Sequence, residues 1–181
     1  MQTHQLIPHP ATPPALVSAI EARVNMDDPR WVKIRWRIEH PSSVIVPPIR
    51  SKSRADGLWQ TTCFELFIQP RGQAGYHEWN FAPSRQWNAY AFTDVRDGMR
   101  PLDVARNPDT QWHGGSAFAL FDVFIARGCL PTTDCDLGIT AVIEEEGDRK
   151  SYWALAHGQP NRPDFHDPAC FTASLAAPRV P

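Results

Sequence analysis

The stretch GLWQTTCFELFIQP, residues 57–70, decides the fold class because apolar side chains alternate along its second half. Phe64, Leu66 and Ile68 would point to one face of a β-strand, whereas Glu65 would point to the other. A buried carboxylate without partners is costly or becomes protonated. We therefore expect a strand here, with Glu65 facing neighbouring polar groups or a ligand.

Runs with the same period-two alternation recur along the chain, separated by turn-forming links. WVKIRWRIEH, residues 31–40, is typical of a half-solvated strand. The chain has 18 prolines in 181 residues, roughly twice the usual share. Proline-rich links between short β-runs favour an all-β domain. Six further runs are strand candidates: residues 61–69, 76–82, 86–92, 118–126, 137–145 and 150–157.

These runs predict an all-β fold, a two-sheet antiparallel β-sandwich, with a barrel as the alternative. The short links within residues 61–92 predict an antiparallel meander in one sheet. Residues 1–14 are interpreted as a proline-rich N-terminal arm and residues 15–181 as a single β-sandwich domain. The long, weakly patterned stretch 93–116 is expected to hide a short strand at RPLDV, residues 100–104.

The charge distribution argues against nucleic-acid and membrane partners. The formal net charge is −2, and no charge run exceeds the three glutamates at 144–146. No apolar run approaches the roughly 18–20 residues of a membrane span. The N-terminus lacks the basic and apolar parts of a secretory signal, so a cytoplasmic protein is expected. The four cysteines match no zinc pattern, so we expect free thiols, no metal and no other cofactor.

The predicted meander has one apolar face and one mixed face. Carboxylates, amides and aromatic rings on a concave sheet face are what a sugar site needs. The rings stack on the apolar faces of pyranoses, while the polar groups bind the hydroxyls. The alternative is an ordinary solvated face of a two-layer sandwich. The mixed face would carry Glu65, Glu78, Asn80, Asn88 and Tyr90.

Several motifs match one known family together. The chain contains LWQTTCFELFI, YHEWNFAPSRQWNAYAF and RDGM, followed by RPDFHDPACF near its end. With these motifs it resembles the stand-alone bacterial DOMON-like proteins of the family 9 carbohydrate-binding-module type. The resemblance covers roughly residues 59–99 and 162–171. It implies a β-sandwich for the whole chain and a sugar held between two tryptophans, with help from a glutamate, an arginine and amides.

The resemblance implies ligand-binding positions in two parts of the chain. Trp59 looks like the first tryptophan, and Glu65 like the glutamate, expected to be ionised and to accept hydrogen bonds from sugar hydroxyls. Where the modules have the second tryptophan, this chain offers Phe165 instead, which is a departure from the pattern. The full set of implied ligand-binding residues is Trp59, Glu65, Asn80, Arg85, Asn88, Asn161, Arg162, Phe165 and His166.

The predicted function is a non-catalytic domain that binds a small saccharide, and two alternatives stay open. One is a haem-binding DOMON domain, in which Met26 or Met99 would pair with His77 or His166 as axial ligands. The other is a structural or protein-interaction sandwich without a ligand. Its interface would be formed by tryptophans: Trp31, Trp112 and Trp153.

Three further interpretations concern single side chains. Glu65 and Glu78 on one face could form a glycosidase pair, although we expect no catalysis. The DFHD segment, residues 164–167, could hold a metal, although Asx-type turns are more common in such segments. Glu65 could also be a structural carboxylate that is hydrogen-bonded to Arg85 or to the backbone.

Overall fold

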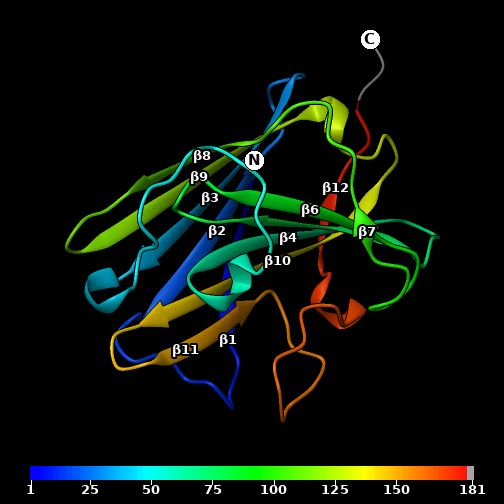
Figure 1. The fold of residues 1–181 in the computed structure, drawn as a ribbon. Helices are drawn as coiled ribbons and strands as arrows, with labels where there is room; N and C mark the ends of the chain where they lie inside the picture. The colour runs from blue at the N-terminus through cyan, green and yellow to red at the C-terminus, as the bar shows by residue number, and fades with distance from the viewer. Residues whose placement is uncertain (179–181) are drawn as a thin grey trace.

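The alternating segments form two antiparallel sheets in a computed structural model that describes residues 1–178 (Figure 1). One sheet has the order β7-β6-β5-β4-β10-β11, with β12 paired to β10, and the other has the order β1-β2-β3-β9-β8. The 3₁₀ helices are single turns at Pro41–Ser43, Leu58–Gln60, Arg127–Cys129 and Pro168–Cys170. The strands are β1 (Gln2–Pro8), β2 (Ala19–Asn25), β3 (Trp31–Glu39), β4 (Cys63–Pro70), β5 (Tyr76–Phe81), β6 (Trp87–Phe92), β7 (Arg100–Pro101), β8 (Asp109–His113), β9 (Phe118–Ala126), β10 (Cys135–Glu145), β11 (Arg149–Ala154) and β12 (Ala173–Leu175).

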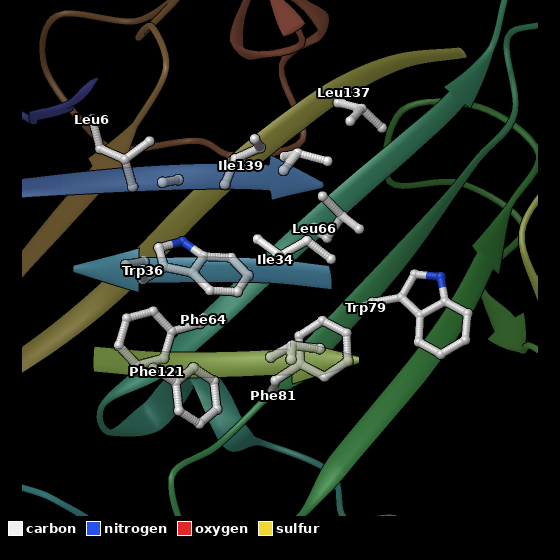
Figure 2. Packing of buried hydrophobic residues seen from close by; sticks show 14 of the residues in the cluster. Leu6, Ile34, Trp36, Phe64, Leu66, Trp79, Phe81, Phe121, Leu137 and Ile139 are labelled. Atoms are coloured by element: carbon white, nitrogen blue, oxygen red, sulfur yellow. The ribbon is translucent and has the colours of Figure 1, made fainter. Parts of the chain in front are cut away.

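The core lies between the two sheets and confirms the sandwich prediction. Figure 2 shows Trp36 of β3, Phe64 of β4 and Phe121 of β9 together in this layer. The rings of Phe64 and Phe121 stack at 4.5 Å between centroids, and Trp36 lies 5.4 Å from Phe64. Side chains from both sheets therefore interdigitate as period-two alternation requires. The twelve apolar residues that the alternation predicts to be largely buried are all buried: Val32, Ile34, Trp36, Phe64, Leu66, Ile68, Trp79, Phe81, Phe121, Val123, Ile139 and Ile143.

The meander is also confirmed, and its register creates the mixed face. Strands β4, β5 and β6 are neighbours in one sheet. Glu65 pairs with Asn80, which pairs in turn with Asn88 on β6. On its other side β4 pairs with β10, where Thr140 lies opposite Glu65. The mixed face therefore continues from β6 across to β10 and β11.

The N-terminal arm prediction is wrong for residues 2–8, which form β1. Its first part pairs with β2, where Leu6 lies opposite Ile20. Its end crosses to the other sheet, where Pro8 lies opposite Trp153 of β11. Leu6 is the only fully buried side chain of the strand, so the segment carries little apolar alternation. The strand joins the two sheets at one edge, which the sequence pattern did not indicate.

Two of the tryptophans proposed for a protein interface serve the core instead. Trp153 is buried, and its indole nitrogen Nε1 donates to Ser151 Oγ at 2.9 Å. Trp112, on β8, packs against Phe64 with the ring centroids 6.3 Å apart. The sequence pattern did not predict β8, which is a short strand within the weakly patterned stretch 93–116. Trp153 is therefore not available for an interface, and Trp112 is half-buried against the core.

The remaining expectations concern cysteines and membrane spans. All four cysteines are free thiols, as expected, and Cys63, Cys135 and Cys170 are buried. Within residues 1–178 the structure contains no helix with the length and apolar character needed to cross a bilayer. The short strand expected near residues 100–104 is present as β7.

Candidate functional site

The mixed face of the meander forms the floor of a pocket of about 360 Å³. Strands β4, β5, β6, β10 and β11 supply its floor and sides. The loop after β6, the turn before β4 and the segment 163–166 complete its rim. The lining residues are Trp59, Glu65, Glu78, Tyr90, Phe92, Arg96, Met99, Val142, Tyr152, Pro163, Phe165 and His166.

Two buried carboxylates occupy the floor of the pocket. Glu65 is 4% exposed and Glu78 is 6% exposed. Thr140 Oγ1 donates to Glu65 Oε2 at 3.2 Å, and Asn80 Nδ2 donates to Glu78 Oε1 at 2.6 Å. Within residues 1–178 no hydrogen bond reaches Glu65 Oε1 and no lysine or arginine pairs with either carboxylate. The floor therefore keeps unused acceptor capacity in a place that is largely closed to bulk water.

The protonation of this pair differs from the sequence-based expectation. Burial, followed by the nearby charge of Glu78, raises the pKa of Glu65 well above its ordinary value. Burial also raises the pKa of Glu78, although the amide of Asn80 and the charge of Arg96 oppose that rise. The surroundings of the pair therefore favour a bound proton, more strongly at Glu65 than at Glu78. A fully ionised Glu65, as predicted from sequence, is not what this environment favours.

His166 lies beside the carboxylates without neutralising them. Its Nδ1 is 2.6 Å from the hydroxyl of Tyr76, and its Nε2 is 3.6 Å from Glu78 Oε2. Burial and the charge of Arg96 lower the pKa of His166 to about 4. The imidazole is therefore neutral at neutral pH and packs edge-on against Phe92, 5.2 Å between centroids.

Aromatic side chains form the walls of the pocket. Trp59 is 43% exposed and lies on the 3₁₀ turn Leu58–Gln60. Gly57 begins that turn at a φ of 71°, a left-handed conformation that favours glycine. Leu58 anchors the turn among buried neighbours, so the following residue is held at the surface. Tyr152 and Phe165 meet at 5.9 Å between centroids on another wall.

An ion pair joins two of the loops at the rim. Arg96 Nη2 donates to Asp164 Oδ1 at 2.6 Å. The backbone N–H of Arg96 donates to the Tyr76 hydroxyl at 3.2 Å, and the N–H of His166 donates to Asp164 Oδ1 at 3.1 Å. These contacts hold the loop after β6 against the segment that carries Phe165. The C-terminal segment thereby reaches the meander, as the family resemblance implied.

The predicted ligand-binding residues separate into three groups. Trp59, Glu65, Phe165 and His166 all line the pocket. Asn80 and Asn88 lie beneath it as hydrogen-bonding partners of lining side chains. Asn80 donates to Glu78, and Asn88 Nδ2 donates to the Tyr90 hydroxyl at 2.8 Å. The remaining three are exposed and do not line the pocket: Arg85, Asn161 and Arg162.

Arg85 lies on the hairpin between β5 and β6, far along the strands from the pocket end. Its backbone has a φ of 77°, which serves the tight turn. The hydrogen bond to Glu65 comes from Thr140 instead. The interpretation of Glu65 as a structural partner of Arg85 is therefore wrong.

Several lining residues were missed although the sequence contained a signal for some of them. Glu78 and Tyr90 follow from the parity of the meander, because they pair across β5 and β6 on the face of the mixed set. Phe92 follows from the same parity, two residues after Tyr90. Arg96 lay in the quoted RDGM motif, but the implied arginine was assigned to Arg85 instead. Tyr152 had no signal from the meander, because its place depends on the pairing of β11 with β10.

The metal interpretation of the DFHD segment is not supported. Within residues 1–178 no group of three histidine, cysteine or acidic side chains is arranged to hold a metal ion. Asp167 caps the turn Pro168–Cys170 by accepting from the N–H of Ala169 at 2.9 Å. Asp164 pairs with Arg96. The segment is an Asx-type turn with a cap, which is the more common role of such residues.

Three solved structures with a similar fold are a proposed carbohydrate-binding protein and a family 9 carbohydrate-binding module in two complexes. A proposed carbohydrate-binding protein from Bacteroides uniformis superposes with a TM-score of 0.63 at 13% identity, covering 96% of this chain and 84% of that chain. A family 9 carbohydrate-binding module from Caldicellulosiruptor kristjanssonii in complex with glucose gives a TM-score of 0.58 at 11% identity, covering 95% of this chain and 82% of that chain. The same kind of module in complex with cellotriose gives 0.58 at 11% identity, covering 97% and 83%.

These similarities establish the fold. No protein-family model and no curated protein matches the sequence. The β-sandwich of the family 9 carbohydrate-binding-module type, expected from the resemblance, is confirmed at the level of the backbone.

Proposed function

We propose that this chain is a non-catalytic domain that binds a small saccharide in the pocket between Trp59 and Phe165. One observation supports this function above all: two buried carboxylates with unused acceptor capacity lie beneath aromatic walls. Hydroxyl groups of a sugar can supply the missing donors, while the rings cover its apolar faces. The similar folds crystallised with glucose and cellotriose support the same class of ligand.

The size of the pocket suits a small ligand. Its volume of about 360 Å³ lies at the lower end of the range of roughly 300–1,000 Å³ for small-molecule sites. A buried floor that can both donate and accept gives specificity, because a ligand without the right hydroxyls leaves polar groups unpaired. A protonated Glu65 could donate one hydrogen bond, and Glu78 could accept another.

The arrangement of the two carboxylates argues for binding rather than glycoside hydrolysis. Glu65 and Glu78 are diagonal neighbours on β4 and β5, since each lies opposite a different residue of the other strand. Both therefore rise from the same floor, and a sugar ring would lie over the pair. A glycosidase instead places its two carboxyl groups on either side of the scissile bond.

Calorimetric titration against a panel of mono- and disaccharides tests the proposal. We expect at least one sugar to bind at millimolar concentration or better. Trp59→Ala should weaken that binding, because the variant removes a wall of the pocket. Arg85→Ala is the matched control, since Arg85 is exposed away from the pocket. The proposal fails if no sugar binds the wild-type protein at millimolar concentration.

Haem binding is the second candidate, because Met99 and His166 line the same pocket. In the structure the two nitrogens of His166 face Tyr76 and Glu78. Axial ligation would require one of these contacts to break. Titration of haem into the protein, followed by its Soret absorption, separates the two functions: a shifted band that His166→Ala removes would favour haem.

A further inference from the structure

We propose that the ligand of this pocket is an amino sugar whose ammonium group binds over Glu65 and Glu78. This inference rests on the proposed function and names the ligand class of the same site. Its starting point is the charge of the floor. Both carboxylates are more than nine-tenths buried, and neither has a lysine or arginine partner within residues 1–178.

Among the described residues, the one arginine or lysine that lines the pocket already has an ion-pair partner. Arg96 lies at the rim, where its guanidinium pairs with Asp164 at 2.6 Å. Its ion pair is with Asp164; its charge also opposes the rise in the pKa of Glu78 that burial causes, but within residues 1–178 it forms no ion pair with the floor carboxylates. Buried carboxylates without a counter-ion are costly. A cation that enters the pocket would supply a counter-ion for the two carboxylates.

An ammonium group fits the open atoms of the floor better than a neutral hydroxyl does. It brings three donors and a charge, whereas a hydroxyl brings one donor. Within residues 1–178, Glu65 Oε1 accepts no hydrogen bond. Glu78 Oε2 also accepts none, because the nitrogen Nε2 of His166 lies 3.6 Å away. Hydrogen bonds between an ammonium and a carboxylate are charge-assisted and stronger than neutral ones. The aromatic walls add a further attraction for a cation.

Proton release is the expected signature of such binding. The empty pair can hold a proton, because burial raises the pKa of both Glu65 and Glu78. An ammonium ligand stabilises both carboxylates in the charged form, so that proton passes to the buffer. A neutral sugar brings hydroxyl donors but no charge, so it should release fewer protons. The other titratable or charged groups near the pair are Cys63, Tyr76, Tyr90, Arg96, Tyr152, Asp164 and His166.

The test is a calorimetric comparison of D-glucosamine, D-glucose and N-acetyl-D-glucosamine at about pH 6, where an amine of this kind is mostly protonated. Each titration is run in two buffers that differ in ionisation enthalpy, which measures protons released. We expect glucosamine to bind about ten- to a hundredfold more tightly than glucose and to release up to about one proton. Glucose and the acetylated sugar should release clearly fewer protons than glucosamine.

The outcomes separate this inference from the proposed function. If glucose binds as tightly as glucosamine, and without proton release, the amino-sugar inference fails while saccharide binding stands. If none of the three sugars binds, and the wider panel also fails, the proposed function falls with it. If choline binds as tightly as glucosamine, the pocket recognises a cation without the sugar, and the amino-sugar inference is again wrong.

Two variants and a control sharpen the result. Glu65→Gln and Glu78→Gln each remove one carboxylate while keeping its shape, so each should reduce the preference for glucosamine and suppress proton release. Glu21→Gln removes the same charge from β2 in the other sheet, and it should change neither quantity. An unchanged proton release in both pocket variants would overturn the assignment of the ammonium to this pair.

Discussion

Glu145 and Glu65 are both buried glutamates on neighbouring strands, yet the protein treats them in opposite ways. Glu145, at the end of β10, is 1% exposed and accepts four hydrogen bonds. The donors are the backbone N–H groups of residues 15–17 and the hydroxyl of Ser43, all within 3.1 Å. Glu65, on β4, accepts one hydrogen bond, from Thr140.

The pKa values of the two side chains diverge for this reason. Burial alone would raise the pKa of Glu145, but hydrogen bonds from the backbone and from Ser43 bring it below its ordinary value. Burial and the charge of Glu78 raise the pKa of Glu65, and one hydroxyl is too little to reverse that. The comparison teaches that burial does not assign a role to a carboxylate. The supply of donors separates the two: Glu145 has its hydrogen bonds within the protein, whereas Glu65 keeps the acceptor capacity that we propose a ligand uses.

The largest expected effect is loss of stability in Glu145→Gln. The amide keeps one acceptor but brings an NH₂ group against converging N–H donors, so at least one buried donor loses its partner. We expect the free energy of unfolding to fall by on the order of 2–3 kcal/mol, measured by urea denaturation at neutral pH. A change below about 0.5 kcal/mol would mean that the four hydrogen bonds are not the reason for the burial of Glu145.

The second-largest expected effect is on saccharide binding in the pocket that contains Glu65. Trp59→Ala should weaken saccharide binding by about tenfold, or ~1.4 kcal/mol, because a flat apolar wall is lost. Its stability should change little, since the side chain is 43% exposed. Calorimetry measures the change in binding free energy, and urea denaturation of the same preparation measures the change in the free energy of unfolding. Equal losses in binding and stability would show that Trp59 acts through the fold instead.

Glu65→Gln should have the opposite sign to Glu145→Gln. Because the folded-state pKa of Glu65 is raised, its contribution to stability is complete at low pH and is lost as the pH rises above the unfolded value of roughly 4.3. The amide that replaces the carboxylate in the variant does not ionise, so the stability of the variant does not fall in this way as the pH rises. We expect the variant to match the wild type near about pH 4 and to be more stable by on the order of 1 kcal/mol at neutral pH.

The pH profile of Glu145→Gln provides the matched control. The folded-state pKa of Glu145 is lowered, so its contribution is present above the unfolded pKa and is lost as the pH falls. The deficit of this variant should therefore shrink in acid, while the gain of Glu65→Gln grows towards neutral pH. Parallel pH profiles for the two variants would contradict the contrast between the sites.

The smallest expected effect is that of Arg85→Ala. Arg85 is exposed on the hairpin between β5 and β6 and does not line the pocket. We expect both saccharide affinity and stability to stay within about 0.5 kcal/mol of the wild type. A clear loss of affinity would restore Arg85 to the ligand-binding set that the family resemblance implied.

The sequence predicted well which side chains share a face of the sheet. It predicted poorly which residues distant along the chain contact them. Parity alone placed Glu65, Glu78 and Asn80 on one face, because side chains of a strand alternate without exception in a regular ladder. It could not find the donors of Glu145, which come from residues more than a hundred positions away along the chain. In the sequence, Glu145 was the last residue of a predicted strand and part of a run of three glutamates, with no sign of a buried role.

Contacts between residues distant along the chain also explain the errors at the pocket rim. Trp59 and Phe165 were found through a family resemblance, and both line the pocket. Arg96 was not, because its role depends on an ion pair with Asp164 that only the folded loops create. β1 was missed for a related reason, since a strand at the junction of two sheets needs little apolar alternation of its own.

The most direct test of the central claim is a crystal structure of the protein soaked separately with D-glucose and D-glucosamine. The account predicts a sugar ring between Trp59 and Phe165, with a hydroxyl or the amine within hydrogen-bonding distance of Glu65 Oε1. The hydrogen bonds around Glu145 should be unchanged. A sugar bound elsewhere on the surface, or an empty pocket at concentrations where calorimetry detects binding, would contradict it.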